Sequence, residues 1–162
     1  MVVPLEALLR RVVRTAEDMF DKLGEIDMLW IYENASGEQQ MVVTPIMAPD
    51  GQVAAAYKTY LAAGMRQLFH QHDVVRYAVA AECWTLGCDL DPDYCGPLGE
   101  HPQRREAIIF EADDGRVFLS AWREIIRPAG GKPYLGKLSA IWRPPRVEGR
   151  FHDLLPRARS ND

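Results

Sequence analysis

The sequence has few cysteines and no long apolar run, and each of these absences excludes a class of protein. Three cysteines in 162 residues are too few, and odd in number, for a disulfide framework, so we expect a reducing environment. No apolar stretch approaches the roughly 18 residues that a membrane-spanning helix needs. Glu6 and Arg10 interrupt the region where a secretory signal peptide would be continuously apolar. These absences predict a soluble, cytoplasmic protein with no membrane partner.

A dominant basic surface is also missing, although the charge is unevenly distributed along the chain. The net charge is −4. Residues 1–126 contain 11 Lys and Arg against 20 Asp and Glu, a net −9, whereas residues 127–162 contain 8 against 3, a net +5. Nucleic-acid-binding domains usually carry a dominant basic face, so we expect the basic end of the chain to pair with acidic residues or with solvent. Nucleic acid is not an expected partner, and binding of an anionic polymer by this end is a distant alternative.

The spacing of apolar residues predicts the secondary structure. Apolar steps of three and four residues predict amphipathic helices over residues 4–23 and 52–71. Pro4 fits the first turn of the first helix, and Gly24 fits its end. The β-rich runs predict strands over 28–32, 40–44, 74–84, 105–112 and 116–126, with 132–142 as a candidate last strand.

Two turns and one alternating pattern refine this assignment. Residues 34–38 supply the Asn, Ser and Gly of a hairpin turn, and Asp113-Asp-Gly115 supplies a second. Within strand 74–84, alternation predicts a core-facing side that includes Tyr77 and Val79, and an opposite side that includes Ala78, Ala80 and Glu82.

The order α-β-β-α-β-β-β predicts an α+β fold in which two helices pack on an antiparallel sheet of about five strands. A chain of this length with 48% hydrophobic residues can bury one core, so we expect residues 1–145 to form a single domain. After Pro144 and Pro145 the chain is rich in Arg and poor in apolar residues. We therefore expect residues 146–162 to form an irregular basic tail.

Residues 82–101 hold the densest group of reactive side chains, with all three cysteines, three alternating aspartates and one of the four histidines. Cys88, Cys95 and His101 are weak candidates for metal ligands, because their spacing departs from the close cysteine pairs of structural zinc sites. The surrounding carboxylates disfavour a thiolate, and therefore thiol catalysis. No cofactor is predicted.

The candidates for a catalytic role are four polar residues of the second half: Glu82, His101, Arg104 and Glu106. Glu82 lies in the middle of a predicted strand, and Arg104 and Glu106 share one face of the next. Antiparallel pairing would bring Glu82 against Arg104 or Arg105. A cross-strand ion pair is the simpler interpretation, because a general acid or base also needs a cleft.

These residues belong to a longer pattern: Glu82-x-Trp84, His101-Pro-x-Arg104-x-Glu106, Arg127, Gly131-x-Pro133 and Leu135-Gly136. The pattern covers about residues 76–138 and resembles a group of uncharacterised bacterial and phage-associated proteins. The resemblance implies no particular activity. In that group a small residue such as Ala separates the Glu from the Trp and the loop has no cysteine pair, so the cysteines of this chain depart from the pattern.

The function that fits these observations best is a non-enzymatic binding or assembly domain that forms homo-oligomers. An exposed sheet edge, an apolar helix face or the Arg-rich tail could provide the interface. The sequence does not identify any other protein partner. The alternative is a small hydrolase or metalloprotein that uses Glu82, His101 and the loop cysteines.

Overall fold

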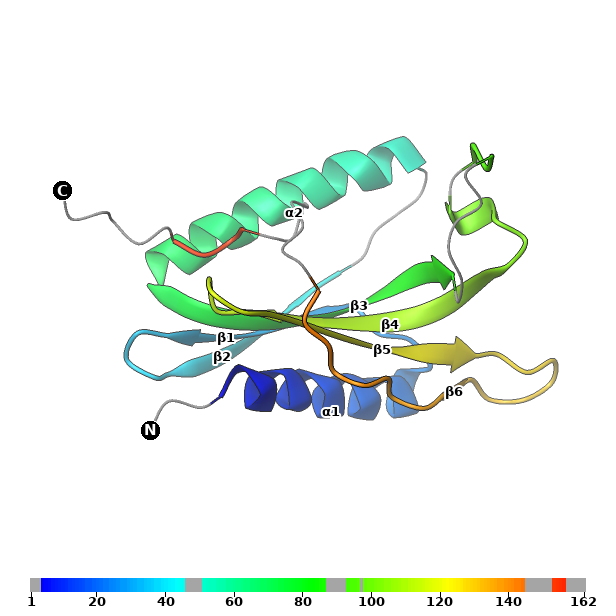
Figure 1. Ribbon diagram of the computed structural model, residues 1–162, viewed down its shortest axis with the longest axis horizontal. Helices are drawn as coiled ribbons and strands as arrows, with labels where there is room; N and C mark the ends of the chain where they lie inside the picture. Colours follow the sequence, from blue (N-terminus) through cyan, green and yellow to red (C-terminus); the bar gives the residue numbers. More distant parts are fainter. Residues whose placement is uncertain (1–3, 46–50, 87–92, 97, 145–152, 157–162) are drawn as a thin grey trace.

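A six-stranded antiparallel sheet lies between two helices (Figure 1). The computed structural model describes residues 4–45, 51–86, 93–96, 98–144 and 153–156. The sheet order is β2-β1-β3-β4-β5-β6. The elements are α1 (Leu5–Leu23), β1 (Met28–Asn34), β2 (Gln39–Thr44), α2 (Gly51–Gln71), β3 (Val74–Leu86), the short 3-10 helix η1 (Leu98–Glu100), β4 (Arg104–Asp113), β5 (Phe118–Ile126) and β6 (Tyr134–Leu135).

This architecture confirms the predicted α+β class and the order of the main elements. The difference lies at the end of the order, where a sixth strand of only two residues, β6, occupies part of the candidate range 132–142. No helix among the described residues is long and apolar enough to cross a membrane.

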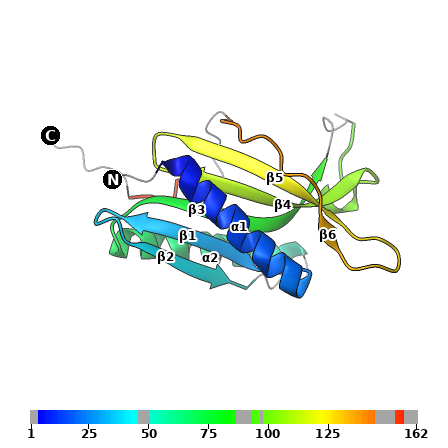
Figure 2. The ribbon, with the colours of Figure 1, turned by 90° about the horizontal axis from the view of Figure 1, so that it is seen from below.

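Helix α1 covers one face of the sheet and forms what we call the α1-side core. Figure 2 shows the helix running diagonally across the strands. Its apolar stripe, including Leu8, Leu9 and Val12, is almost fully buried. The helix ends as the sequence predicts: Gly24 has a φ of 73° and donates its N–H to the Phe20 carbonyl at 2.7 Å, a conformation that glycine adopts without steric cost.

Helix α2 covers the opposite face over β1 and β3 and forms the α2-side core. Four aromatic residues make its centre: Trp30, Tyr32, Phe69 and Tyr77, each no more than 2% exposed. The Phe69 ring lies 5.0 Å from Tyr77 and 5.5 Å from Tyr32, measured between ring centroids. Leu154, which falls within the predicted tail, is fully buried in the same core.

Strand β3 corrects the prediction that only one of its faces is core. Tyr77 and Val79 are buried in the α2-side core, as expected, but Ala78 and Ala80 on the other face are fully buried as well. The reason is the three-layer arrangement, in which α1 packs on the face that the sequence pattern left to solvent. Small alanine side chains allow that close approach.

The two outer edges of the sheet differ. Along the outer side of β5, the chain from β6 to Trp142 runs back and forms hydrogen bonds with backbone groups of that strand. Gly136 N–H donates to the Glu124 carbonyl at 2.8 Å, and Ser120 and Trp142 exchange two backbone hydrogen bonds of 3.0 Å. The opposite edge is β2, which pairs only with β1 among the described residues.

Candidate functional site

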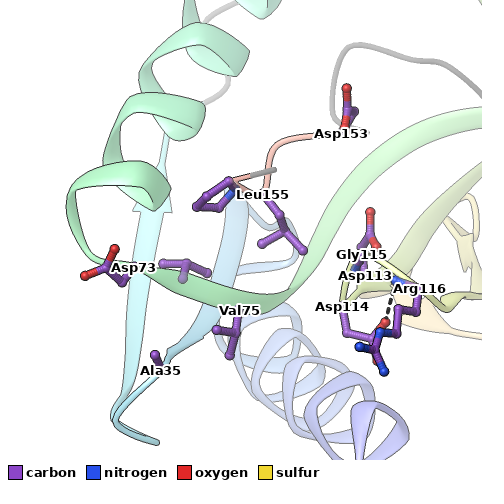
Figure 3. Close-up of a pocket in the computed structure, with 11 residues that line it drawn as sticks. Ala35, Asp73, Val75, Asp113, Asp114, Gly115, Arg116, Asp153 and Leu155 are labelled. Atoms are coloured by element: carbon purple, nitrogen blue, oxygen red, sulfur yellow. Dashed lines mark hydrogen bonds between the residues drawn. The ribbon is translucent and has the colours of Figure 1, made fainter. Parts of the chain in front are cut away.

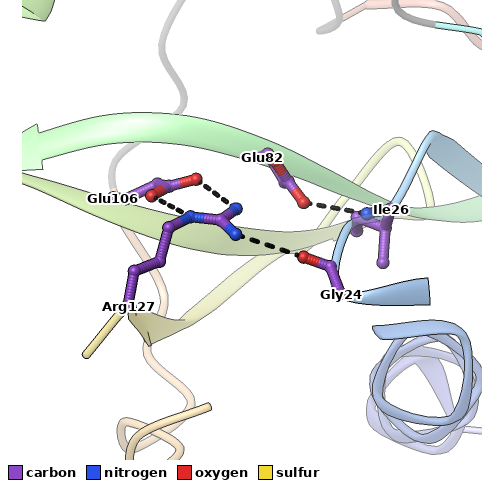
Figure 4. A network of polar contacts seen from close by, with 5 residues as sticks. All are labelled: Gly24, Ile26, Glu82, Glu106 and Arg127. Carbon is purple, nitrogen blue, oxygen red and sulfur yellow. Dashed lines mark hydrogen bonds and ion pairs between the residues drawn. The ribbon is translucent and has the colours of Figure 1, made fainter. Parts of the chain in front are cut away.

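A polar network joins three of the strands to the connection between α1 and β1 (Figure 4). Arg127, just after β5, donates from Nε and Nη2 to the two carboxylate oxygens of Glu106 on β4, both at 2.7 Å. Its Nη1 donates to the Gly24 carbonyl at 3.4 Å. Glu82 on β3 accepts the Ile26 backbone N–H at 2.8 Å. The structure thus brings together two of the predicted candidates, Glu82 and Glu106, around an arginine that the predicted site lacked.

The predicted partner of Glu82 was wrong. The observed register places Glu82 opposite Ile108, whereas Arg104 and Arg105 lie opposite Leu86 and Thr85, nearer the end of the strand pair. Ile108 is fully buried in the α1-side core, and a shift in pairing by one residue would move it to the other face. Burial of the β4 side chains therefore sets the register and keeps both arginines away from Glu82.

Electrostatics at Glu82 favour its protonated form. Burial raises the pKa of Glu82, and the nearby Glu106 carboxylate adds to this effect. The Ile26 N–H and the Arg127 charge act in the opposite direction and lower the pKa. A carboxyl group with a raised pKa can serve as a general acid. In this network, however, one of its oxygens is already held by a backbone N–H, and the network contains no histidine or nucleophile.

His101, Trp84 and Arg104 hold the loop between β3 and β4 against the strands. His101 is 8% exposed, and its Nδ1 accepts the Gln103 N–H at 3.0 Å. Its ring meets the Tyr94 ring edge to face, with 4.5 Å between centroids. The Arg104 guanidinium lies 4.9 Å from the centre of the Trp84 ring and also donates to the His101 carbonyl at 3.2 Å. His101 and Arg104 therefore act in the loop structure and do not join Glu82.

The loop cysteines are only partly described. Cys88 lies outside the described residues. Cys95 is exposed, and its thiol donates to the Asp93 carbonyl at 3.4 Å. Cys83 is partly buried in β3, and burial, with the Glu111 carboxylate nearby, raises the pKa of its thiol to about 11. A thiol that resists deprotonation is a poor nucleophile and metal ligand. Among the described residues, no three His, Cys, Asp or Glu side chains are grouped so that they could hold a metal ion.

Glu111 is a perturbed carboxyl group that the sequence analysis missed. It lies on β4, partly buried, on the face of the sheet that carries α2. Burial, and secondarily the Asp113 carboxylate, raise its pKa from 4.5 to about 7. The Glu111 carboxylate in turn raises the pKa of the Cys83 thiol on β3, and Lys58 on α2 lowers that same pKa. The sequence pattern that could have indicated Glu111 is its position between the apolar residues Phe110 and Ala112. Alternation along the strand places Glu111 on the face opposite to these two residues.

An open pocket of about 650 Å³ lies where the β4–β5 turn, the start of β3 and residues 153–156 meet (Figure 3). Its charged lining consists of four aspartates and one arginine, a net −3: Asp73, Asp113, Asp114, Asp153 and Arg116. Several of these groups already serve the fold. Asp113 Oδ1 accepts the Gly115 N–H at 2.7 Å, and Asp114 Oδ1 accepts the Arg116 N–H at 2.9 Å. The pocket is therefore an acidic hollow that would favour cations over anions.

The β2 edge is the second surface feature that stands out. The strand Gln39–Thr44 carries no charged residue. Two of its apolar side chains are unusually open to solvent, Met41 at 56% and Val43 at 41% exposed. Natural sheet edges are commonly protected by charged residues or by a covering segment, and β2 has neither in the described part of the chain.

The comparisons with known proteins give no family assignment. No protein-family model matches the chain, no curated protein matches it, and no solved structure matches it. The resemblance based on Glu82-x-Trp84 and His101-Pro-x-Arg104-x-Glu106 therefore stays a prediction.

Proposed function

We propose that this protein is a cytoplasmic, non-enzymatic binding or assembly domain that self-associates. The observation that carries the proposal is the β2 edge, a strand with no charge, two exposed apolar side chains and, among the residues that the structure describes, no neighbouring strand on its outer side. Such an edge is a template for pairing with another strand. A protein that uses it for association has no need of charged residues that would block the edge.

The surroundings of the candidate catalytic residues support the same proposal. The side chains of Glu106 and Arg127 pair with each other, Glu82 accepts a backbone N–H, and His101 Nδ1 accepts another. Each of these contacts joins segments of the chain that are distant from one another or closes a turn. The polar residues with catalytic potential thus contribute to the structure.

The test is the mass of the protein in solution. Light scattering after gel filtration, or sedimentation equilibrium, at protein concentrations from about 1 to 100 μM should give at least twice the 18.4 kDa mass of the chain. A mass that stays at 18.4 kDa over the whole range would contradict self-association.

The alternative is a hydrolase or metalloprotein that uses Glu82, His101 and the loop cysteines. The raised pKa of Glu82 favours this alternative. It predicts stoichiometric metal in protein purified without chelator, lost in the double variant Cys88→Ala/Cys95→Ala, or hydrolysis of ester or phosphate substrates that Glu82→Gln abolishes. Metal-free protein that is inactive on such substrates would exclude this alternative.

A further inference from the structure

We infer that the partner at the β2 edge is a second copy of this chain, paired strand to strand across a two-fold axis that passes through Val42. This inference rests on the proposed self-association and names its surface and register. It would join two sheets of six strands into one continuous antiparallel sheet.

The hydrogen bonds of the β1–β2 hairpin show which residues of β2 face outward. Asn34 N–H donates to the Glu38 carbonyl at 3.0 Å, and the Asn34 carbonyl accepts the Gly37 N–H at 3.0 Å, so the backbone groups of Asn34 point towards β2 and this is a hydrogen-bonding position of the ladder. Hydrogen-bonded and non-hydrogen-bonded pairs alternate along an antiparallel ladder. In the observed register, which pairs Tyr32 with Gln40 and Trp30 with Val42, the inward-bonding residues of β2 are therefore the even-numbered ones. Gln39, Met41 and Val43 direct their N–H and C=O groups away from β1.

The exposed side chains belong to these same residues. Val42 packs against the α2-side core, and successive side chains of a strand point to opposite faces. Met41 and Val43 therefore lie on the α1 side, beyond the strands that α1 covers, which explains their exposure. A neighbouring strand would both bond to their backbone groups and cover their side chains.

Self-pairing is restricted to few registers, and one of them matches all residues from Gln40 to Thr44. An antiparallel neighbour must set outward-bonding residues opposite outward-bonding residues. With Met41 opposite Val43 of the second copy, Val42 faces its own equivalent on the axis, and Gln40 faces Thr44. Apolar side chains then meet apolar side chains, and polar meet polar.

In the neighbouring registers, polar side chains would face apolar ones. A two-fold axis at Met41 would set Gln39 against Val43 and Gln40 against Val42. An axis at Val43 would set Val42 against Thr44 and Met41 against Pro45. Within the bounds of β2, an axis at Val43 pairs only residues 42–44, whereas the axis at Val42 pairs residues 40–44 and leaves Pro45, which has no N–H to donate, opposite Gln39 at the end of the paired segment. The strand is thus complementary to itself in one register.

Cysteine cross-linking tests this register. In a background with Cys83, Cys88 and Cys95 changed to alanine, Val42→Cys should form a disulfide-linked dimer under mild oxidation. The two Cα atoms of a non-hydrogen-bonded pair lie about 4.5 Å apart, within the range of disulfides. Met41→Cys should cross-link poorly with itself, because its equivalents would be diagonal neighbours roughly 7 to 8 Å apart. A mixture of Met41→Cys and Val43→Cys should cross-link as a heterodimer.

A charge variant tests the same surface without a cross-linking reaction. Val43→Lys should raise the dimer dissociation constant roughly tenfold or more, while Tyr134→Lys at the opposite edge should leave it unchanged. Tyr134 is a matched control, because it is 53% exposed and also lies on an outer strand. Circular dichroism should show that both variants keep the fold of the original chain.

The outcomes separate the two proposals. A dimer that Val42→Cys links and Val43→Lys dissociates supports the β2 interface. A dimer that neither variant affects overturns the β2 interface and leaves self-association standing. A monomer at all concentrations overturns both proposals.

Discussion

The pH dependence of stability should report on Glu111, the partly buried carboxyl group on β4. Its pKa is about 7 in the folded protein, against an ordinary value of 4.5. The folded state therefore holds a proton on Glu111 at pH values where the unfolded chain has released it. The free energy of unfolding must fall as the pH rises from 4.5 to 7, and the loss is complete above pH 7.

The size of the effect follows from the same values. A change in pKa from 4.5 to about 7 corresponds to roughly 3 kcal/mol. Glu111 is only partly buried, so solvent screening reduces this figure, and we expect roughly 1 to 3 kcal/mol. Glu111→Gln keeps the shape of the side chain and removes the titration. The variant should match the original protein near pH 4.5 and exceed its stability by that amount at pH 8.

The assay is urea unfolding followed by tryptophan fluorescence at pH 4.5, 6 and 8, at one fixed protein concentration because association would add to stability. Glu100→Gln is the control, since it makes the same chemical change at an exposed position. If Glu111→Gln and the original protein differ by the same amount at all three pH values, Glu111 is ionised in the folded protein without cost and the reasoning fails.

Three further predictions concern stability. Phe69→Ala should lower the free energy of unfolding by about 3 to 5 kcal/mol, because Phe69 is fully buried among aromatic rings. The control for this change, Tyr60→Ala at an exposed position of α2, should alter the free energy of unfolding by less than about 0.5 kcal/mol. Arg127→Gln should lower the free energy of unfolding by about 1 kcal/mol. A double-mutant cycle with Glu106→Gln should assign most of this loss to the interaction between the two side chains, and a coupling energy near zero would contradict a stabilising ion pair. Asp73 has a φ of 49°, a conformation that costs a β-branched residue steric energy but costs glycine none. Asp73→Val should therefore destabilise the protein by about 1 to 2 kcal/mol, whereas Asp73→Gly should not. Equal thermal denaturation midpoints for the two variants would contradict backbone strain at this position.

Part of the candidate site could be predicted from the sequence. The reactive residue types were visible, and Glu82 and Glu106 do share a network. The arginine partner predicted for Glu82, Arg104 or Arg105, was wrong. The arginine of the network is Arg127, which reaches Glu106 from just after β5, 21 positions away in the sequence. Residue spacing within one strand does not say which distant side chain will lie across from it.

The sequence by itself determined the local elements. Apolar spacing located α1 and α2, Gly24 marked the end of α1, and the turn at 34–38 joined the first two strands. These features depend on the period of a helix or strand and on the φ angles that a residue can adopt. Both are properties of short segments, so they can be read without the fold.

Only the tertiary structure decided which faces are buried and which edge stays open. The burial of Ala78 and Ala80 follows from the position of α1, and the register of β4 follows from the burial of Ile108. The return of the chain along β5 left β2 as the open edge of the sheet in the described residues. Each outcome depends on packing between segments far apart in the sequence, and a short segment carries no information on which of its possible neighbours it will meet.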